Sequence, residues 1–275
     1  MCLSPDIKGE CNKKAQEMKK RDIGADGALI VSSDVWLALG LLSRLPLPTP
    51  PDLARSSRAS WAYPIVGLVV GGLAALVALV AQALLIPTAM TAALILTTLI
   101  VVTGAMHEDG LADTADGLWG GWDSTRRLEI MKDSHIGAYG VIALILALLA
   151  RWTLLVALLA TSSPALAILG VAAVSRAPMV AVMAALPHAR AEGLSRSVGR
   201  PDQRTALVAA GVAGIIALLI WGVLGLWICA VAYGAALGMG LIARAKIAGQ
   251  TGDILGATQQ ISEIAALTAL ATMLS

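Results

Sequence analysis

Acidic residues are concentrated in one segment of the sequence, and their spacing suits chemistry that a divalent cation assists. Residues 107–117 have the sequence HEDGLADTADG, in which Asp109, Asp113 and Asp116 are separated by four and three positions. On a helix this spacing places three carboxylates on one face, where their negative charges repel one another. A bound cation removes that repulsion, and oxygen ligands suit Mg²⁺ or Mn²⁺ better than zinc. The segment therefore predicts a magnesium site, with a solvated acidic loop as the alternative.

Polar residues in two later segments are suited to binding phosphate or metal. Lys132, Asp133 and Ser134 follow the acidic segment, where Lys132 and Asp133 either contact phosphate and metal or form an ordinary surface pair. Gly252 and Asp253 precede the last apolar stretch. A helix N-terminus with small residues and one carboxylate is typical of a phosphate or metal site, although a plain helix cap has the same composition.

A histidine and two arginines complete the candidate groups. His107 begins the acidic segment and acts either as a general base or as a hydrogen-bonded structural residue. Arg176 lies within an apolar stretch, where a charged side chain is costly and usually functional, so we expect it to contact a buried anion. Arg190 belongs to the basic segment 187–205 and is a second predicted anion contact.

The elements that position these residues are expected to be helices in a membrane. The chain has 275 residues, of which 57% are hydrophobic and 14% charged, and its mean hydropathy is +0.79. Soluble domains carry about a quarter charged residues. The composition therefore excludes a disordered chain, a nucleic-acid-binding surface and an ordinary soluble enzyme.

Continuous apolar stretches predict an all-α polytopic membrane helix bundle of about seven spans, within a range of six to eight. A spanning helix needs roughly 20 apolar residues. The candidate stretches are 64–86, 89–106, 138–160, 165–186, 206–222, 225–243 and 256–274. Segment 28–45 contains Asp34 and Arg44, so we expect a re-entrant or interfacial helix there. Residues 1–27 form a polar extension, and residues 28–275 form one membrane-embedded domain.

The connections between these stretches alternate between charged and uncharged. Short connections near 87–88, 161–164 and 222–225 contain no charge. Most of the remaining charged residues lie in the connections 46–63, 107–137, 187–205 and 244–253. Because Lys and Arg are retained on the cytoplasmic side, we expect the charged connections, and with them the candidate site, to face the cytoplasm.

Three motifs resemble the cobalamin synthase family, also called the adenosylcobinamide-GDP ribazoletransferases. HEDGLADTADG, RLEIMKDSHIGAYG and GQTGDILGA are close to the family patterns H-x-D-G-L-A-D-T-x-D, L-E-I-M-K-D-S-x-I-G and T-G-D-x-L-G-A. The resemblance covers about residues 35–275, and the joint occurrence of three motifs is far more specific than any one of them. His135 stands where an arginine is common in the family.

This resemblance implies the last assembly step of the cobalamin nucleotide loop. Adenosylcobinamide-GDP would react with α-ribazole or its 5′-phosphate to give adenosylcobalamin or its phosphate, with release of GMP. The resemblance also implies Mg²⁺ as cofactor and the bacterial inner membrane as location. Besides the substrates and membrane lipid, it leaves open a homo-oligomer or an association with other cobalamin-assembly enzymes.

The resemblance and the chemistry of the side chains together give a set of predicted site residues. The catalytic group comprises His107, Asp109, Asp113, Asp116 and Lys132. The metal ligands are Asp109, Asp113, Asp116, Asp133 and Asp253. The substrate contacts are Arg176, Arg190, Gly252 and Ser134. His107 is our expected base for the ribazole hydroxyl, and the basic residues would bind the GDP phosphates.

Two other functions remain as alternatives. A CDP-alcohol phosphotransferase also uses clustered aspartates, but its D-G-x-x-A-R core has an arginine where Asp113 follows Ala112 here. A secondary transporter would explain Arg151, Arg176 and Glu263 within apolar stretches. A transporter would leave the concentration of carboxylates in one connection unexplained.

Overall fold

The computed structural model describes residues 29–47 and 55–274, and the polar extension 1–27 lies outside this range. The described residues form helices without a β-strand, which confirms the all-α prediction. In chain order the helices are α2 (Ser33–Leu42), α3 (Ser56–Ala59), η2 (Ser60–Ala62), α4 (Tyr63–Ala83), α5 (Thr88–Thr103), α6 (Met106–Gly120), α7 (Ser124–Ile130), α8 (Ala138–Leu159), α9 (Pro164–Val174), α10 (Ala177–Ala185), α11 (Leu194–Val198), α12 (Gln203–Trp221), α13 (Leu224–Ile247) and α14 (Gly252–Leu274).

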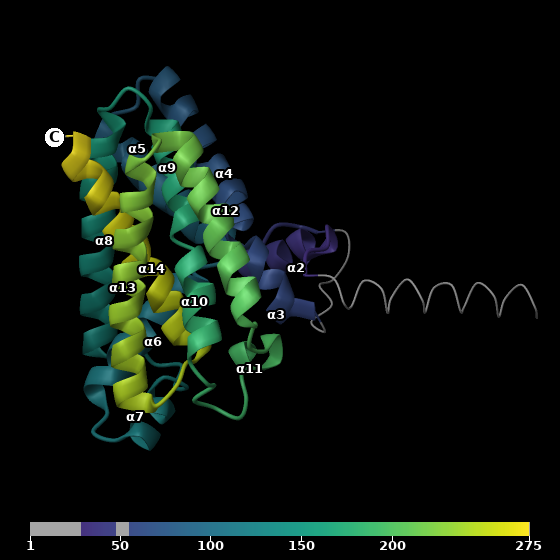
Figure 1. Cartoon of the computed structure of the whole chain (residues 1–275). Coiled ribbons are helices and arrows are strands. Elements are labelled where there is room, and N and C mark those ends of the chain that lie inside the picture. The colour runs from purple at the N-terminus through teal and green to yellow at the C-terminus, as the bar shows by residue number, and fades with distance from the viewer. Residues whose placement is uncertain (1–28, 48–54, 275) are drawn as a thin grey trace, which may run out of the picture.

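The long helices run beside one another as a bundle (Figure 1). Five helical segments of the described chain are long and apolar enough to cross a membrane: Ser56–Ala83, Ala138–Leu159, Pro164–Ala185, Gln203–Trp221 and Leu224–Ile247. A sixth span results if α5 and α6 are taken together. The polytopic membrane fold is therefore confirmed. The count of seven stays a prediction, because α14 is 23 residues long but is interrupted by polar side chains.

The short helix α2 is fastened beside the first long helix. Its ten residues extend only about 15 Å, half the thickness of a hydrocarbon core. Asp34 is fully buried and accepts hydrogen bonds from Arg55 Nε at 2.8 Å and Trp61 Nε1 at 2.8 Å. The predicted helix within 28–45 is thus present, and it is too short to span.

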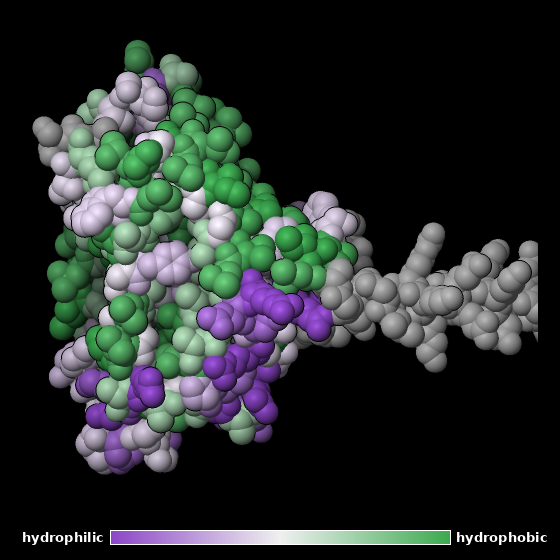
Figure 2. All heavy atoms as spheres, viewed as in Figure 1, coloured by the Kyte–Doolittle hydropathy of each residue, from purple (hydrophilic) through white to green (hydrophobic). Residues whose placement is uncertain are grey.

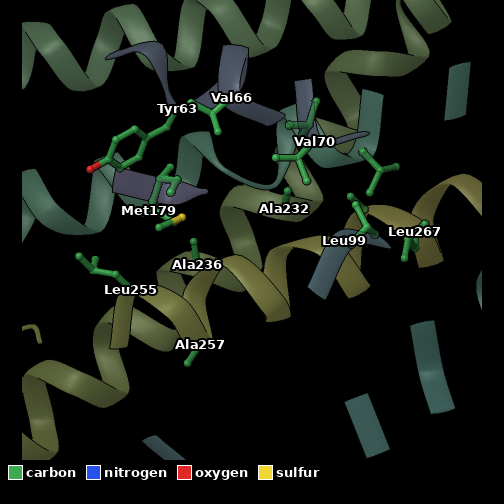
Figure 3. Close-up of a cluster of buried hydrophobic side chains, with 14 of the residues drawn as sticks. Tyr63, Val66, Val70, Leu99, Met179, Ala232, Ala236, Leu255, Ala257 and Leu267 are labelled. Carbon is green, nitrogen blue, oxygen red and sulfur yellow. The ribbon is translucent and has the colours of Figure 1, made fainter. Parts of the chain in front are cut away.

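Small and aliphatic side chains allow the helices to approach closely. In Figure 3, Tyr63, Val66 and Val70 of α4 belong to a buried apolar cluster that also contains Met179 of α10 and Ala232 of α13. The backbones of α4 and α9 come together at a glycine, because a Cβ on Gly67 would collide with the carbonyl oxygen of Ala172. Close backbone contacts of this kind are typical of helices packed in a membrane.

A sharp bend separates α5 from α6 and differs from the sequence prediction. Gly104 and Ala105 both have positive φ angles, and the two helices meet at 88°. The segment that begins at His107 was expected to be a connecting loop at the end of a span. Instead it forms α6, and His107 and Glu108 in its first turn are buried in the bundle. Glu108 can be buried because Arg151 of α8 and Gln260 of α14 donate hydrogen bonds to it.

Three of the four charged connections, 107–137, 187–205 and 244–253, gather at one end of the bundle (Figure 1), as predicted, whereas residues 48–54 of the fourth lie outside the described residues. Arg127 Nη1 donates to the Lys246 carbonyl at 2.9 Å, and Arg190 Nη2 donates to the Leu128 carbonyl at 3.2 Å. Residues His188 and Gln250 form an isolated parallel β-bridge. Figure 2 shows the most hydrophilic residues collected toward the end near α7 and α11, while hydrophobic residues predominate over the remainder of this face, with weakly polar ones scattered among them.

Candidate active site

The site is built where α6 crosses α14. A Cβ on Gly110 would lie 2.9 Å from the Asp253 carbonyl oxygen and 3.1 Å from the Gly256 Cα, so only a glycine fits at this crossing. The contact brings Asp109, which precedes Gly110, close to the first turn of α14. Two segments that are far apart in the sequence therefore place their carboxylates together.

These carboxylates line a cavity of about 200 Å³. Its walls include Asp109 and Asp253, the backbone of Gly252, and Arg190 from the 186–193 connection. Arg190 Nη1 lies 3.2 Å from Asp253 Oδ2. A Cβ added at Gly252 would meet no atom within 4 Å, so the backbone here faces open space. The cavity thus joins acidic groups, the guanidinium groups of Arg190 and Arg196, and exposed backbone.

Negative charge predominates around this cavity. Asp113 interacts electrostatically with Asp253, Asp109 and Asp116, and Arg190 is the cation among its nearest charges. The structure therefore brings together three predicted metal ligands from two helices, namely Asp109, Asp113 and Asp253. Their mutual repulsion is offset only in part by Arg190.

Asp116 has a different position from the other acids of α6. Its two carboxylate oxygens accept hydrogen bonds from the backbone N–H groups of Gly137 at 2.7 Å and Gly140 at 2.9 Å. Both donors lie at the N-terminus of α8, where a carboxylate also interacts favourably with the helix dipole. In this structure Asp116 fastens α6 to α8, and its predicted role as a metal ligand stays a prediction.

The donors around the cavity suit Mg²⁺ in type, although no complete cage is present. Among the described residues, no three His, Cys, Asp or Glu side chains are arranged to hold a metal ion. Mg²⁺ usually binds one or two protein carboxylates and completes its shell with water and substrate phosphate. The oxygen donors of Asp109, Asp113 and Asp253 therefore fit a cation that would bind together with a phosphorylated substrate.

His107 lies beside a second, apolar cavity of about 50 Å³. This cavity is lined by Tyr63, Met179 and Leu255, and it adjoins the acidic cavity through Gly252. Only 2% of His107 is exposed, and within the described part of the chain its Nε2 has no hydrogen-bond partner. A buried imidazole nitrogen without a partner is available to a ligand or a reacting hydroxyl.

A buried ionic network lies beneath the site. Arg151 of α8 donates to Glu108 Oε1 at 2.8 Å and to Gln260 Oε1 at 2.7 Å, and its Nε lies 3.0 Å from Glu263 Oε1. Arg176 is also buried and donates to the carbonyl of Ala172. The charges that act on Arg176 are those of Glu263, Glu108 and Arg151, so the nearest anions to this predicted anion contact are protein carboxylates.

The predicted site residues 132–134 are exposed and do not join the cluster of Asp109, Asp113 and Asp253. Lys132, Asp133 and Ser134 all lie in exposed positions after α7. Asp133 accepts a hydrogen bond from the backbone N–H of His135 and contacts its Nδ1 at 2.7 Å. The hydrogen bond with Asp133 raises the pKa of His135, and the same pair lowers the pKa of Asp133.

Sequence reasoning did not select four residues that line the acidic cavity, namely His188, Ser195, Arg196 and Gln250. The only signal for them was the high charge of 187–205 and the proximity of Gln250 to Asp253 in sequence. Their meeting depends on the bridge between His188 and Gln250, which no local pattern predicts.

Comparison with known proteins assigns the chain to a family. Residues 34–271 match the cobalamin-5-phosphate synthase family. The chain belongs to this family. It is 45% identical over 256 residues to the adenosylcobinamide-GDP ribazoletransferase of Rhizobium etli (strain CIAT 652), covering 88% of this chain and 97% of the relative. The family match contains α6, the 186–193 connection and the start of α14, so it includes every wall of the acidic cavity.

Other relatives carry the same enzyme name. The protein of Azorhizobium caulinodans is 42% identical over 252 residues, covering 86% of this chain and 94% of the relative. The protein of Mesorhizobium japonicum is 41% identical over 253 residues, covering 89% and 95%. No solved structure matches the chain. The family is therefore established by sequence similarity.

Proposed function

We propose that this cobalamin-5-phosphate synthase family member is an adenosylcobinamide-GDP ribazoletransferase. It performs the final step of nucleotide-loop assembly, joining adenosylcobinamide-GDP to α-ribazole or α-ribazole 5′-phosphate and releasing GMP. The observation that carries this proposal is the convergence of two family motifs, on α6 and α14, at one cavity with excess carboxylates. Neither a CDP-alcohol phosphotransferase nor a transporter accounts for both the family match and this convergence.

The reaction breaks the phosphoanhydride bond of the donor diphosphate and forms a phosphate ester bond to the acceptor. A ribazole hydroxyl oxygen forms a bond to the phosphorus nearer cobinamide, and the bond from this phosphorus to the GMP oxygen breaks. The electron pair of the broken bond stays on the GMP phosphate, and the hydroxyl proton passes to a base. Little covalent chemistry is required of the protein, so positioning and charge stabilisation provide most of the catalysis.

Each role follows from where a side chain lies. Asp109, Asp113 and Asp253 would hold Mg²⁺, which when bound neutralises charge on the diphosphate. Arg190 binds phosphate next to Asp253, because its Nη1 lies 3.2 Å from Asp253 Oδ2 in the wall of the cavity. His107 accepts the hydroxyl proton at Nε2, the nitrogen left without a partner in the described chain. Gly252 lets the substrate approach the backbone closely.

We also propose that the protein spans the bacterial inner membrane and that its site faces the cytoplasm. The charged connections lie at the same end of the bundle as the acidic cavity. The positive-inside rule then orients this end toward the cytoplasm. Lipid surrounds the apolar helices, whereas a homo-oligomer and an association with other cobalamin-assembly enzymes stay predictions.

Membrane vesicles containing the full chain test the proposed activity. We expect GMP release that requires adenosylcobinamide-GDP, α-ribazole or its phosphate, and Mg²⁺ together. Vesicles without the protein serve as the control. Accumulation of substrate inside the vesicles without GMP release would overturn the proposal in favour of transport. GMP release with an alcohol acceptor in place of α-ribazole would overturn it in favour of another phosphotransferase.

A further inference from the structure

A basic groove beside the acidic cavity provides a separate binding surface. It has a volume of about 580 Å³ and is lined by Pro187, His188, Ala189, Arg190, Ala191, Arg196, Gly199 and Arg200. Among these lining residues there is no acidic side chain. We propose that this basic groove binds the GMP portion of the donor, with His188 and Arg196 contacting the phosphate that leaves. The inference rests on the proposed function and adds the place and residues of the leaving group.

His188 is held in an orientation that leaves one N–H group available. Gln250 Nε2 donates to His188 Nδ1 at 2.9 Å, and Ser195 Oγ donates to Gln250 Oε1 at 2.7 Å. Because Nδ1 accepts, a neutral imidazole carries its proton on Nε2. Burial and the nearby charges of Arg196 and Arg200 lower the pKa of His188, which keeps the ring neutral. The groove therefore contains a preoriented hydrogen-bond donor.

The three arginines of the groove differ in how far they are committed to protein partners. Arg190 contacts Asp253 and the Leu128 carbonyl. Arg200 donates to the Ala184 carbonyl at 2.6 and 2.9 Å, which satisfies the C-terminal end of α10. In the described chain, no hydrogen bond or ion pair engages the exposed Arg196. Arg196 is thus the guanidinium that an incoming anion can engage without breaking an existing contact.

The basic groove is continuous with the acidic cavity. His188, Arg190 and Arg196 line both spaces. A diphosphate can therefore lie with its reacting phosphorus beside Asp109 and Asp253 and its other phosphate in the groove. When the bond between them breaks, negative charge develops on the phosphate in the groove. Guanidinium and imidazole N–H donors stabilise that charge, because charge-assisted hydrogen bonds are stronger than neutral ones.

The size and position of the groove favour a mononucleotide over a lipid. Its volume lies within the range of about 300–1,000 Å³ that is usual for small-molecule sites. An anionic lipid headgroup offers the same phosphate chemistry, and the site lies at the charged end of a membrane protein. The side chains of His188, Arg190 and Arg196 line both spaces and so connect the groove to the reacting centre. A lipid site would not need this connection.

Binding of GMP to the purified full chain in nanodiscs of zwitterionic lipid tests the proposal. We expect Arg196→Gln to weaken GMP binding at least about tenfold and to leave the weaker binding of guanosine unchanged. The same variant should raise the KM for adenosylcobinamide-GDP without raising that for α-ribazole. Arg126→Gln is the matched control, because Arg126 is an exposed arginine paired with Glu129 outside the groove. It should bind GMP like the wild type.

Three outcomes separate the possible failures. Equal GMP affinity in the wild type and Arg196→Gln would overturn the groove assignment, even if turnover is intact. Loss of GMP binding on adding phosphatidylglycerol, together with Arg196-dependent binding of that lipid, would overturn it in favour of a lipid site. Arg196-dependent GMP binding in a wild type that releases no GMP from the donor would support the groove and overturn the proposed function.

Discussion

Glu108 and Asp109 are neighbours on α6, yet their carboxylates lie in opposite electrostatic environments. Glu108 is buried and its Oε1 accepts hydrogen bonds from Arg151 at 2.8 Å and Gln260 at 3.1 Å. Asp109 is exposed to the acidic cavity, where Asp113 and Asp253 carry the same charge. The charge of Glu108 is therefore compensated by protein groups, whereas the charge of Asp109 depends on a bound cation for compensation.

The buried ionic network around Glu108 connects three helices through the guanidinium of Arg151. Arg151 of α8 contacts Glu108 of α6 and Glu263 of α14, and the amide of Gln259 donates to Glu263 Oε2 at 2.6 Å. Buried charges are tolerated in a membrane bundle when they pair with one another. This network fixes α6 and α14 against each other, and therefore fixes the positions of the acids that extend from them.

In the proposed site, the uncompensated acids are where the protein gives up stability for function. Asp109, Asp113 and Asp253 repel one another, and Arg190 offsets only part of that charge. A cation and a phosphate that bind together would restore neutrality. The difference between the regions leads to different expectations: mutations in the network reduce stability, and mutations in the cluster reduce activity.

The largest effect is expected when the network loses its guanidinium. Arg151→Leu leaves Glu108 and Glu263 buried without their main cation and should lower the free energy of unfolding by about 3–5 kcal/mol. Denaturant unfolding of the purified protein in detergent micelles measures the change. Arg126→Leu removes an exposed arginine and should cost no more than about 1 kcal/mol. Equal losses of unfolding free energy in the two variants would show that the network does not stabilise the fold.

A smaller effect, on activity alone, is expected in the acidic cluster. Asp113→Asn keeps the shape of the side chain and removes its charge, so GMP release should fall at least about 100-fold. The free energy of unfolding should not fall, because the substitution relieves repulsion with Asp109 and Asp253. Glu129→Gln on exposed α7 is the control for activity. Turnover of Asp113→Asn at the wild-type rate in saturating Mg²⁺ would contradict the assignment.

The smallest effect is expected at the exposed Asp133. Replacing Asp133 by Asn removes the carboxylate that raises the pKa of His135, so this pKa should fall toward its usual value. An NMR titration of the His135 ring measures the shift, with His188 as an internal reference. GMP release should stay within about twofold of the wild type, as for most surface substitutions. A loss of tenfold or more would place Asp133 in the metal site, as the sequence motif predicts.

The apolar stretches were sufficient to predict the bundle, because hydrocarbon permits few spanning structures besides helices. They did not predict the bend at Gly104 and Ala105, since an acidic segment such as α6 has the composition of a loop. The burial of Glu108 in α6 depends on Arg151 and Gln260, which come from distant parts of the chain.

Spacing predicted the acidic cluster only in part. The i, i+4 pair of Asp109 and Asp113 does approach Asp253 across the helix crossing. Asp116 shares their helix face but is engaged by the N-terminus of α8. The groups contributed by His188 and Arg196 depend on a connection that folds back onto Gln250. Side chains brought together by long-range packing of this kind leave no periodic signal in the sequence.

The central claim is that the uncompensated acids of α6 and α14 hold a divalent cation beside a diphosphate. Electron paramagnetic resonance of Mn²⁺ with the purified full chain and GDP tests it most directly, because bound and free Mn²⁺ give different signals. We expect the wild type and Glu129→Gln to bind Mn²⁺ with coupling to phosphorus, and Asp113→Asn and Asp253→Asn to lose this binding. Equal Mn²⁺ binding with phosphorus coupling in all four proteins would contradict the account.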